Sequence, residues 1–244
     1  MGLGSMAIPN RIWTKARSDL LVVEEPRCKD CFLLEHCTRV ARSAERIATE
    51  LLVEGKQIDF PALAAAALYH DAGWIVQYRD AVVERMEILC KPTTTAQRQL
   101  GAAFLETRLA GILKPESLQL AAESVRRLND RDLDIPEALA VADAENLDQV
   151  GGLSLWTMVR RHSLEGKGLE HGLEVWKRQC EYHYWEAWIQ DSFRFEQVRE
   201  LARTRLAVFS GFMAELAELH ASGDLNALAG NATPDTMIPR NNPS

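Results

Sequence analysis

Hydrophobic residues recur every three or four positions along most of the chain, the spacing that gathers side chains on one face of an α-helix. Strictly alternating stretches, which would predict strands, are scarce. We therefore expect an all-α protein. Prolines favour the first turn of a helix and glycines favour its end, so these residues divide the pattern into separate helices. The expected helices are 11–23, 32–54, 60–73 after a cap at Asp59, 95–109 with a cap at Thr94 or Thr95, two that begin at Pro115 and Pro136, and two long ones within 165–219 that meet near Asp191 and Ser192.

The pattern also predicts how the chain is organised into domains. No internal repeat and no linker divides it, so residues 26–221 are expected to form a single helical domain. Residues 1–25 form an N-terminal segment, in which 1–6 have the character of a cloning remnant. Residues 222–244 contain prolines, glycines and asparagines but few large apolar side chains, and a flexible tail is expected there.

Composition narrows the classes of function. The chain has 244 residues, of which 47% are hydrophobic, and this suffices for a substantial core. A net charge of −7 argues against a nucleic-acid polymer as partner, because phosphate contacts need a basic surface. No apolar run approaches the roughly 20 residues of a membrane span, and no secretory signal opens the sequence. Five scattered cysteines do not predict a disulfide framework, so the reducing cytoplasm is the expected location.

Four polar residues fall on the apolar faces of three predicted helices. His70 and Asp71 are adjacent at the end of an apolar helix, His36 lies upstream and Asp143 downstream. Burying such groups is costly unless they are hydrogen-bonded or coordinated, and a bound cation makes inward-facing carboxylates and imidazoles favourable. For any one of these residues alone, a core histidine or a capping aspartate is a more common role than a metal ligand. The four in this order favour a divalent transition-metal site.

Three segments around these residues resemble the signatures of the HD-domain superfamily of metal-dependent phosphohydrolases. They are 35–41 (EHCTRVA), 68–74 (LYHDAGW) and 142–148 (ADAENLD), and the resemblance covers about residues 32–161. It implies an all-helical fold. The metal ligands that it implies are His36, His70, Asp71 and Asp143.

The sequence differs from members of this superfamily at two points, which bear on the number of metal ions and on the type of reaction. No histidine lies between His70 and His162, the interval in which dinuclear members carry extra histidines, so one metal ion is expected. Members that act as 5′-nucleotidases place a glutamate three residues after the paired aspartate. Here Trp74 occupies that position, which argues against this branch.

A divalent ion with open coordination positions suits phosphoester hydrolysis by an activated water. We expect a hydrolase acting on a small phosphorylated molecule, with a nucleotide as one candidate, in which Asp71 also orients the water as a catalytic residue. Arg39 and Lys91 are candidate contacts for the substrate phosphate, although both also suit solvent-exposed roles. The ion is one of Mn, Mg, Co, Ni, Zn or Fe. The alternative is a non-catalytic HD module that binds metal or nucleotide in a regulatory or interaction role.

Two other groups of residues suggest further sites. Cys28, Cys31 and Cys37 could bind a metal, but a second pair of ligands at suitable spacing is missing, so free thiols are favoured. The aromatic-rich stretch 176–188 is expected to pack the long helices. The alternatives for this stretch are the face of a homodimer and a pocket wall that stacks on a base.

Overall fold

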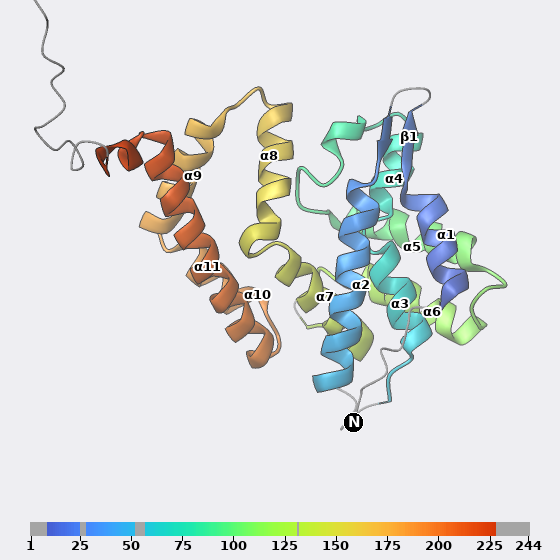
Figure 1. Ribbon diagram of the computed structural model, residues 1–244. Coiled ribbons are helices and arrows are strands. Elements are labelled where there is room, and N and C mark those ends of the chain that lie inside the picture. The colour runs from blue at the N-terminus through green and yellow to red at the C-terminus, as the bar shows by residue number, and fades with distance from the viewer. Residues whose placement is uncertain (1–8, 25–27, 52–56, 131, 228–244) are drawn as a thin grey trace, which may run out of the picture.

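The computed structural model describes residues 9–24, 28–51, 57–130 and 132–227 (Figure 1). Within these residues the regular secondary structure is almost entirely helical, which confirms the predicted all-α class. One short antiparallel hairpin is the exception, with Val23 opposite Lys29. The elements in chain order are α1 (Asn10–Leu20), β1 (Val22–Glu24), β2 (Cys28–Asp30), α2 (Phe32–Leu51), α3 (Phe60–Tyr69), α4 (Gly73–Arg79), the 3₁₀ helix η1 (Arg85–Glu87), α5 (Thr95–Leu109), α6 (Pro115–Arg126), α7 (Pro136–Asp148), η2 (Gly151–Leu153), α8 (Ser154–Leu164), α9 (Leu169–Glu181), α10 (Tyr184–Ser192), α11 (Glu196–His220) and η3 (Gly223–Leu225).

Helices begin where the capping signals predict. The Asp59 carboxylate accepts a hydrogen bond from the backbone N–H of Ala62 at 2.9 Å and so caps α3. Thr94 and Gln97 form a reciprocal capping box at the start of α5. Pro115 and Pro136 each occupy the first turn of a helix. These starts were predictable because each depends on neighbouring residues only.

Helix ends were predicted less well. The stretch 165–219 holds three helices within the described residues rather than two, because His183 adopts a left-handed backbone (φ 51°) between α9 and α10. Aromatic residues continue the apolar pattern across this break and conceal it. The first predicted helix stops at Leu20, and residues 22–24 pair as a strand. The predicted helix 60–73 ends at Tyr69, and a turn separates it from α4. Predictions for residues 1–6, 52–54 and 228–244 lie outside the described residues.

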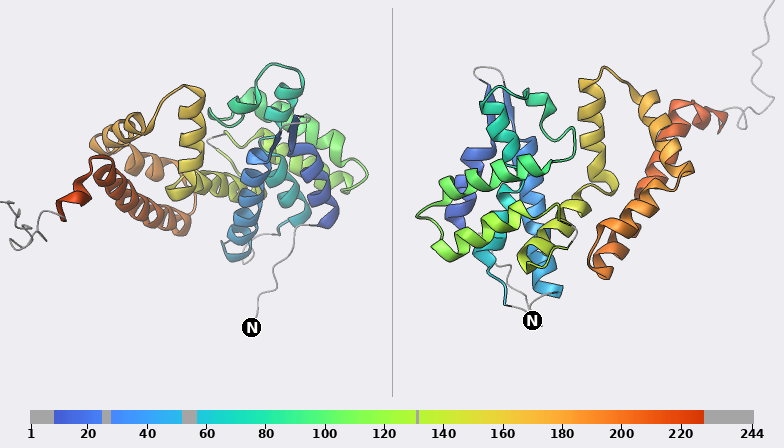
Figure 2. Two further views of the ribbon diagram at one scale, coloured as in Figure 1. Left: turned by 45° about the horizontal axis from the view of Figure 1, so that its top comes forward. Right: turned by 180° about the vertical axis from the view of Figure 1, so that it is seen from behind.

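The helices form two groups joined through η2 and α8. Figure 1 shows α1 to α7 bundled on one side and α9 to α11 on the other, and the view from behind in Figure 2 shows the same grouping. One buried apolar cluster nevertheless runs through both groups, because Ile189, Phe193 and Val198 join the core that includes Leu147 of α7. The predicted division into segments 1–25, 26–221 and 222–244 stays a prediction. None of the described helices is both long and apolar enough to cross a lipid bilayer.

Helix α3 lies at the centre of the bundle and is buried from Ala62 to Tyr69. Four consecutive alanines, residues 64–67, give it a narrow profile, so α2 and α7 can both pack against it. Histidine 36 of α2 and the His70–Asp71 pair that follows α3 are thereby brought together.

Two glycines set the close contact between α4 and α5. A Cβ atom on Gly73 would lie 2.1 Å from the carbonyl oxygen of Gln97, and one on Gly101 would lie 3.1 Å from the backbone nitrogen of Gly73. Only glycine allows the backbones to approach this closely. The contact holds α5 against the turn that carries His70 and Asp71.

We expect Gly73→Ala to destabilise the fold by on the order of 3 kcal/mol, because the added methyl group meets backbone that cannot move aside. Denaturant unfolding measures this change. Gly211→Ala in α11 is the matched control, because its Cβ would meet no atom of the described residues within 4 Å. It should stabilise the helix by about 0.5–1 kcal/mol. Equal effects of the two substitutions would contradict the importance of the α4–α5 contact.

Candidate metal centre

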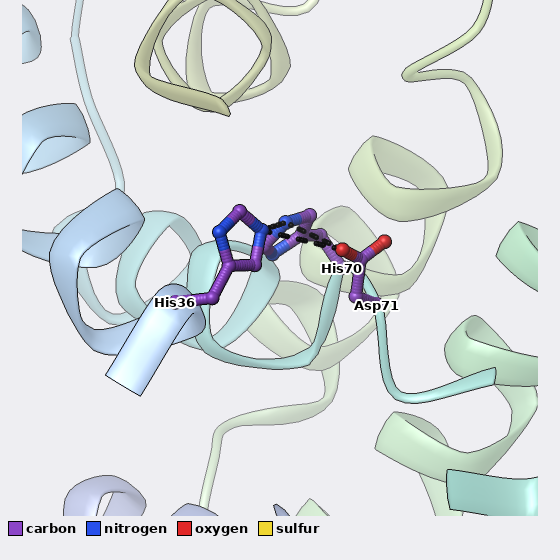
Figure 3. Close-up of side chains that lie close together, drawn as sticks. All are labelled: His36, His70 and Asp71. Carbon is purple, nitrogen blue, oxygen red and sulfur yellow. Dashed lines mark hydrogen bonds and ion pairs between the residues drawn. The ribbon is translucent and has the colours of Figure 1, made fainter. Parts of the chain in front are cut away.

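His36, His70 and Asp71 meet at the centre of the bundle (Figure 3). The two Nε2 atoms lie 3.1 Å apart. The Oδ2 atom of Asp71 lies 3.3 Å from Nε2 of His36 and 3.4 Å from Nε2 of His70. All three side chains are buried. Within the described residues, this is the one group of three or more side chains with the spacing to hold a metal ion.

Hydrogen bonds on the far side of each ring fix which nitrogen carries a proton. Nδ1 of His70 lies 2.7 Å from the carbonyl oxygen of Ala67, which can only accept, so Nδ1 donates. Nδ1 of His36 lies 2.7 Å from Oδ2 of Asp148 and donates to it in the same way. With only these Nδ1 protons present, both Nε2 atoms point lone pairs at each other and at the Asp71 carboxylate. Three such atoms repel one another unless a cation lies among them, so the donor set fits a divalent metal.

The pKa values of His36 and Asp71 indicate that this cluster favours a positive charge among its atoms. Burial alone lowers the pKa of His36, but hydrogen bonds to the carboxylates of Asp148 and Asp71 raise it to about 9. Burial opposes ionisation of Asp71, yet His70, Arg98 and His36 hold its pKa below the ordinary value. A proton on Nε2 of His36 is one cation that satisfies the cluster, and a divalent ion is the other.

The second oxygen of Asp71 is bound on the opposite side. Oδ1 accepts hydrogen bonds from Nη1 of Arg98 at 2.7 Å and from the Thr93 hydroxyl at 2.6 Å. The Arg98 guanidinium is buried, and it also donates to the carbonyl oxygen of His70 at 3.0 Å and to both carboxylate oxygens of Glu145 at 2.6 and 2.7 Å. The buried Arg98 guanidinium thus links Asp71, a predicted metal ligand, to Glu145 of α7.

Arg98, Thr93 and Glu145 are not among the site residues predicted from the sequence. A signal for Arg98 was present, because it shares the helical stripe of Ala102 and Leu105 on α5, where an arginine is unexpected. Glu145 lies inside a segment that carries the family resemblance. Nothing in the sequence marks Thr93, which comes from a loop.

Asp143, the fourth predicted ligand, does not join the cluster of three. Its two oxygens accept hydrogen bonds from the backbone N–H of Arg194 at 3.0 and 3.1 Å, and Oδ2 also accepts from the N–H of Phe195 at 3.0 Å. Burial raises the pKa of this carboxyl. The residue therefore ties α7 to the start of α11, while Glu145, two positions later, shares Arg98 with Asp71. Its role as a ligand stays a prediction.

Arg39 and Lys91, the two residues predicted to contact a substrate phosphate, have different surroundings. Arg39 donates from Nε and Nη2 to the two oxygens of Asp148, at 2.8 and 2.9 Å, and its side chain is 33% exposed. Asp148 in turn holds His36, and these two cationic partners lower the Asp148 pKa to about 2 against the effect of burial. Lys91 is exposed in the loop before α5. Neither placement tests binding of a phosphate.

The cysteine-bound metal is not favoured. Cys31 is exposed and donates to a carboxylate oxygen of Glu35 at 2.9 Å, and Cys37 is a buried free thiol. Among the described side chains neither belongs to a metal-binding group of three. The side chain of Cys28 lies outside the described part.

Comparison with known proteins rests on solved structures, since neither a family model nor a curated protein sequence matches the chain. A predicted HD superfamily hydrolase from an uncultured Thermotogales bacterium is 17% identical, with a TM-score of 0.51 over 91% of this chain and 99% of that one. YpgQ from Bacillus subtilis is 19% identical, with a TM-score of 0.50 over 86% of this chain and 93% of that one. The chain has the HD-domain fold. This confirms the fold that the three sequence segments implied, and identities this low show the fold alone.

The position of Asp143 in this HD-domain fold can be tested by Asp143→Ala. Losing the acceptor for two backbone N–H groups should destabilise the protein by about 1–3 kcal/mol and speed amide hydrogen exchange at Arg194 and Phe195. If Asp143 serves only to tie α7 to α11, metal content stays the same as in the wild type. Asp191→Ala, at an exposed aspartate of α10, is the control. Loss of the metal with unchanged hydrogen exchange would instead support the sequence-based ligand set.

Proposed function

We propose that the protein is a metal-dependent phosphohydrolase that cleaves a phosphoester of a small molecule, with nucleotides among the candidate substrates. The observation that carries the proposal is the convergence of two imidazole Nε2 atoms and Oδ2 of Asp71, with the spacing to hold a metal ion, in an HD-domain fold. His36, His70 and Asp71 would hold one divalent ion. When bound, such an ion lowers the pKa of a coordinated water and offsets charge on a phosphoryl oxygen.

The protein residues around the cluster supply orientation. Asp148 and the Ala67 carbonyl fix the two imidazoles in the tautomer that presents Nε2. We assign Asp71 a second role, orienting the attacking water. Because its pKa is lowered, the carboxylate suits a hydrogen-bond acceptor better than a strong general base.

Substrate recognition is proposed for Arg39 and Lys91. Arg39 is partly exposed one helical turn from His36, so the part of its guanidinium that does not bind Asp148 can meet a phosphate oxygen. Lys91 offers a second positive charge from a loop. The absence of histidines from 71 to 161 supports one metal ion rather than two. Homodimer formation and a cytoplasmic location remain expectations from the sequence.

The direct test is a screen of phosphorylated metabolites with Mn²⁺, Mg²⁺, Co²⁺ or Ni²⁺, followed by Asp71→Asn. This substitution keeps the size of the side chain but removes its charge, so we expect loss of the bound metal and of turnover with unchanged helical content by circular dichroism. Asp191→Asn should behave like the wild type. A wild-type protein that binds metal but turns over no phosphoester would favour the non-catalytic HD module.

Arg39→Ala separates two roles of that residue. If Arg39 contacts the substrate, its loss should cost about 1.5–3 kcal/mol of binding, which is roughly a 10- to 150-fold rise in KM. Asp148→Asn serves as the comparison, because it disturbs His36 without removing the arginine. Equal losses of metal affinity in both variants, with KM unchanged in each, would show that Arg39 serves only to hold Asp148.

A further inference from the structure

A ring of hydrogen bonds surrounds Oδ1 of Asp71, the oxygen that faces away from the imidazoles. The indole N–H of Trp74 donates to the Thr93 hydroxyl at 2.9 Å, and that hydroxyl donates to Oδ1 at 2.6 Å. Arg98 donates to the same oxygen at 2.7 Å. Asn129 closes the ring, since it donates to the carbonyl oxygen of Thr93 at 3.1 Å and accepts from Nε of Arg98 at 3.3 Å.

The direction of these bonds is fixed by the chemistry of the indole. An indole N–H can only donate, so the Thr93 oxygen accepts from Trp74 and its own proton is directed to the carboxylate. Trp74 is 4% exposed, and water therefore competes little for this bond. The indole acts on Asp71 through Thr93 and does not touch Asp71 by a hydrogen bond of its own among those described.

The ring has a consequence for the carboxylate. With two charge-assisted donors on Oδ1, rotation of the Asp71 side chain would break both bonds in a buried setting. Oδ2 is therefore the oxygen left to face the two Nε2 atoms. A carboxylate held in this way offers one oxygen to a metal ion rather than two.

We propose that Thr93, oriented by Trp74, is a positioning residue that together with Arg98 makes Asp71 a one-oxygen ligand. This inference rests on the proposed metal site and assigns a use to Trp74, the residue that departs from the nucleotidase branch of the family. Removing the Thr93 hydroxyl should weaken metal binding about tenfold, the lower end of the range for residues that orient a metal ligand. It should also alter the coordination of the ion.

The experiment is titration of the full-length protein with Co²⁺, followed by its visible absorption, which reports coordination number as well as affinity. Thr93→Val removes the hydroxyl at nearly constant volume, and Thr93→Ser keeps it. Trp74→Phe removes the indole donor and keeps an aromatic ring. Thr107→Val is the control, because that exposed threonine lies on the same helix as Arg98 and, among the described residues, its hydroxyl bonds only to a backbone carbonyl.

We expect Thr93→Val to lower Co²⁺ affinity about tenfold and to change the absorption bands, while Thr93→Ser and Thr107→Val match the wild type. Trp74→Phe should have a smaller effect, and the Trp74→Phe/Thr93→Val double variant should equal Thr93→Val, because the indole acts through the hydroxyl. Wild-type affinity and bands in Thr93→Val would overturn the inference, and so would additive effects in the double variant. A wild-type protein that binds no Co²⁺ would instead overturn the proposed metal site.

Discussion

Two imidazole nitrogens and a carboxylate oxygen face one another in the middle of this helical bundle, and the surrounding structure depends on that constraint. A carboxylate oxygen and two imidazole nitrogens within 3.1 to 3.4 Å of one another require positive charge among them. A helical protein of this size could fill the same volume with leucine and alanine at lower cost. The polar cluster is therefore best understood as a functional feature that the fold supports.

The support comes from opposite sides of the cluster. On one side Asp148 orients His36 and is itself held by Arg39. On the other, Arg98 and Thr93 bind the outer oxygen of Asp71. Charges therefore alternate outward from the centre, so that each buried ion has a partner of opposite sign. Removing one member would leave its neighbour unpaired in a buried setting, which costs more than the pair itself contributes.

Backbone packing makes this arrangement geometrically accessible. The alanines of α3 let α2 and α7 approach from both sides, and the contact at Gly73 brings α5 close enough for Arg98 to reach Asp71. The second group of helices is tied in through Asp143, whose carboxylate receives the backbone N–H groups that precede α11. Small side chains thus allow the helices to approach closely, and the Asp143 carboxylate adds a polar link to an apolar core.

The sequence by itself determined the helical class, most helix starts and the three residues that meet. Helix caps such as Asp59 and Thr94 act over three residues, so they can be recognised locally. His36, His70 and Asp71 stood out because polar residues on apolar helical faces are costly to bury without a partner.

Only the tertiary structure decided the partners of these groups. Asp143 and Glu145 lie two positions apart on α7, and a helix sends such side chains in different directions; which of them turns toward Asp71 depends on the rotation of α7 against α3 and α5. Thr93 and Trp74 are 19 residues apart and meet only because the chain folds back between α4 and α5. The periodicity of apolar residues predicts which face of a helix is buried, but not which side chains pack against that face. The chemistry of this site depends on those contacts.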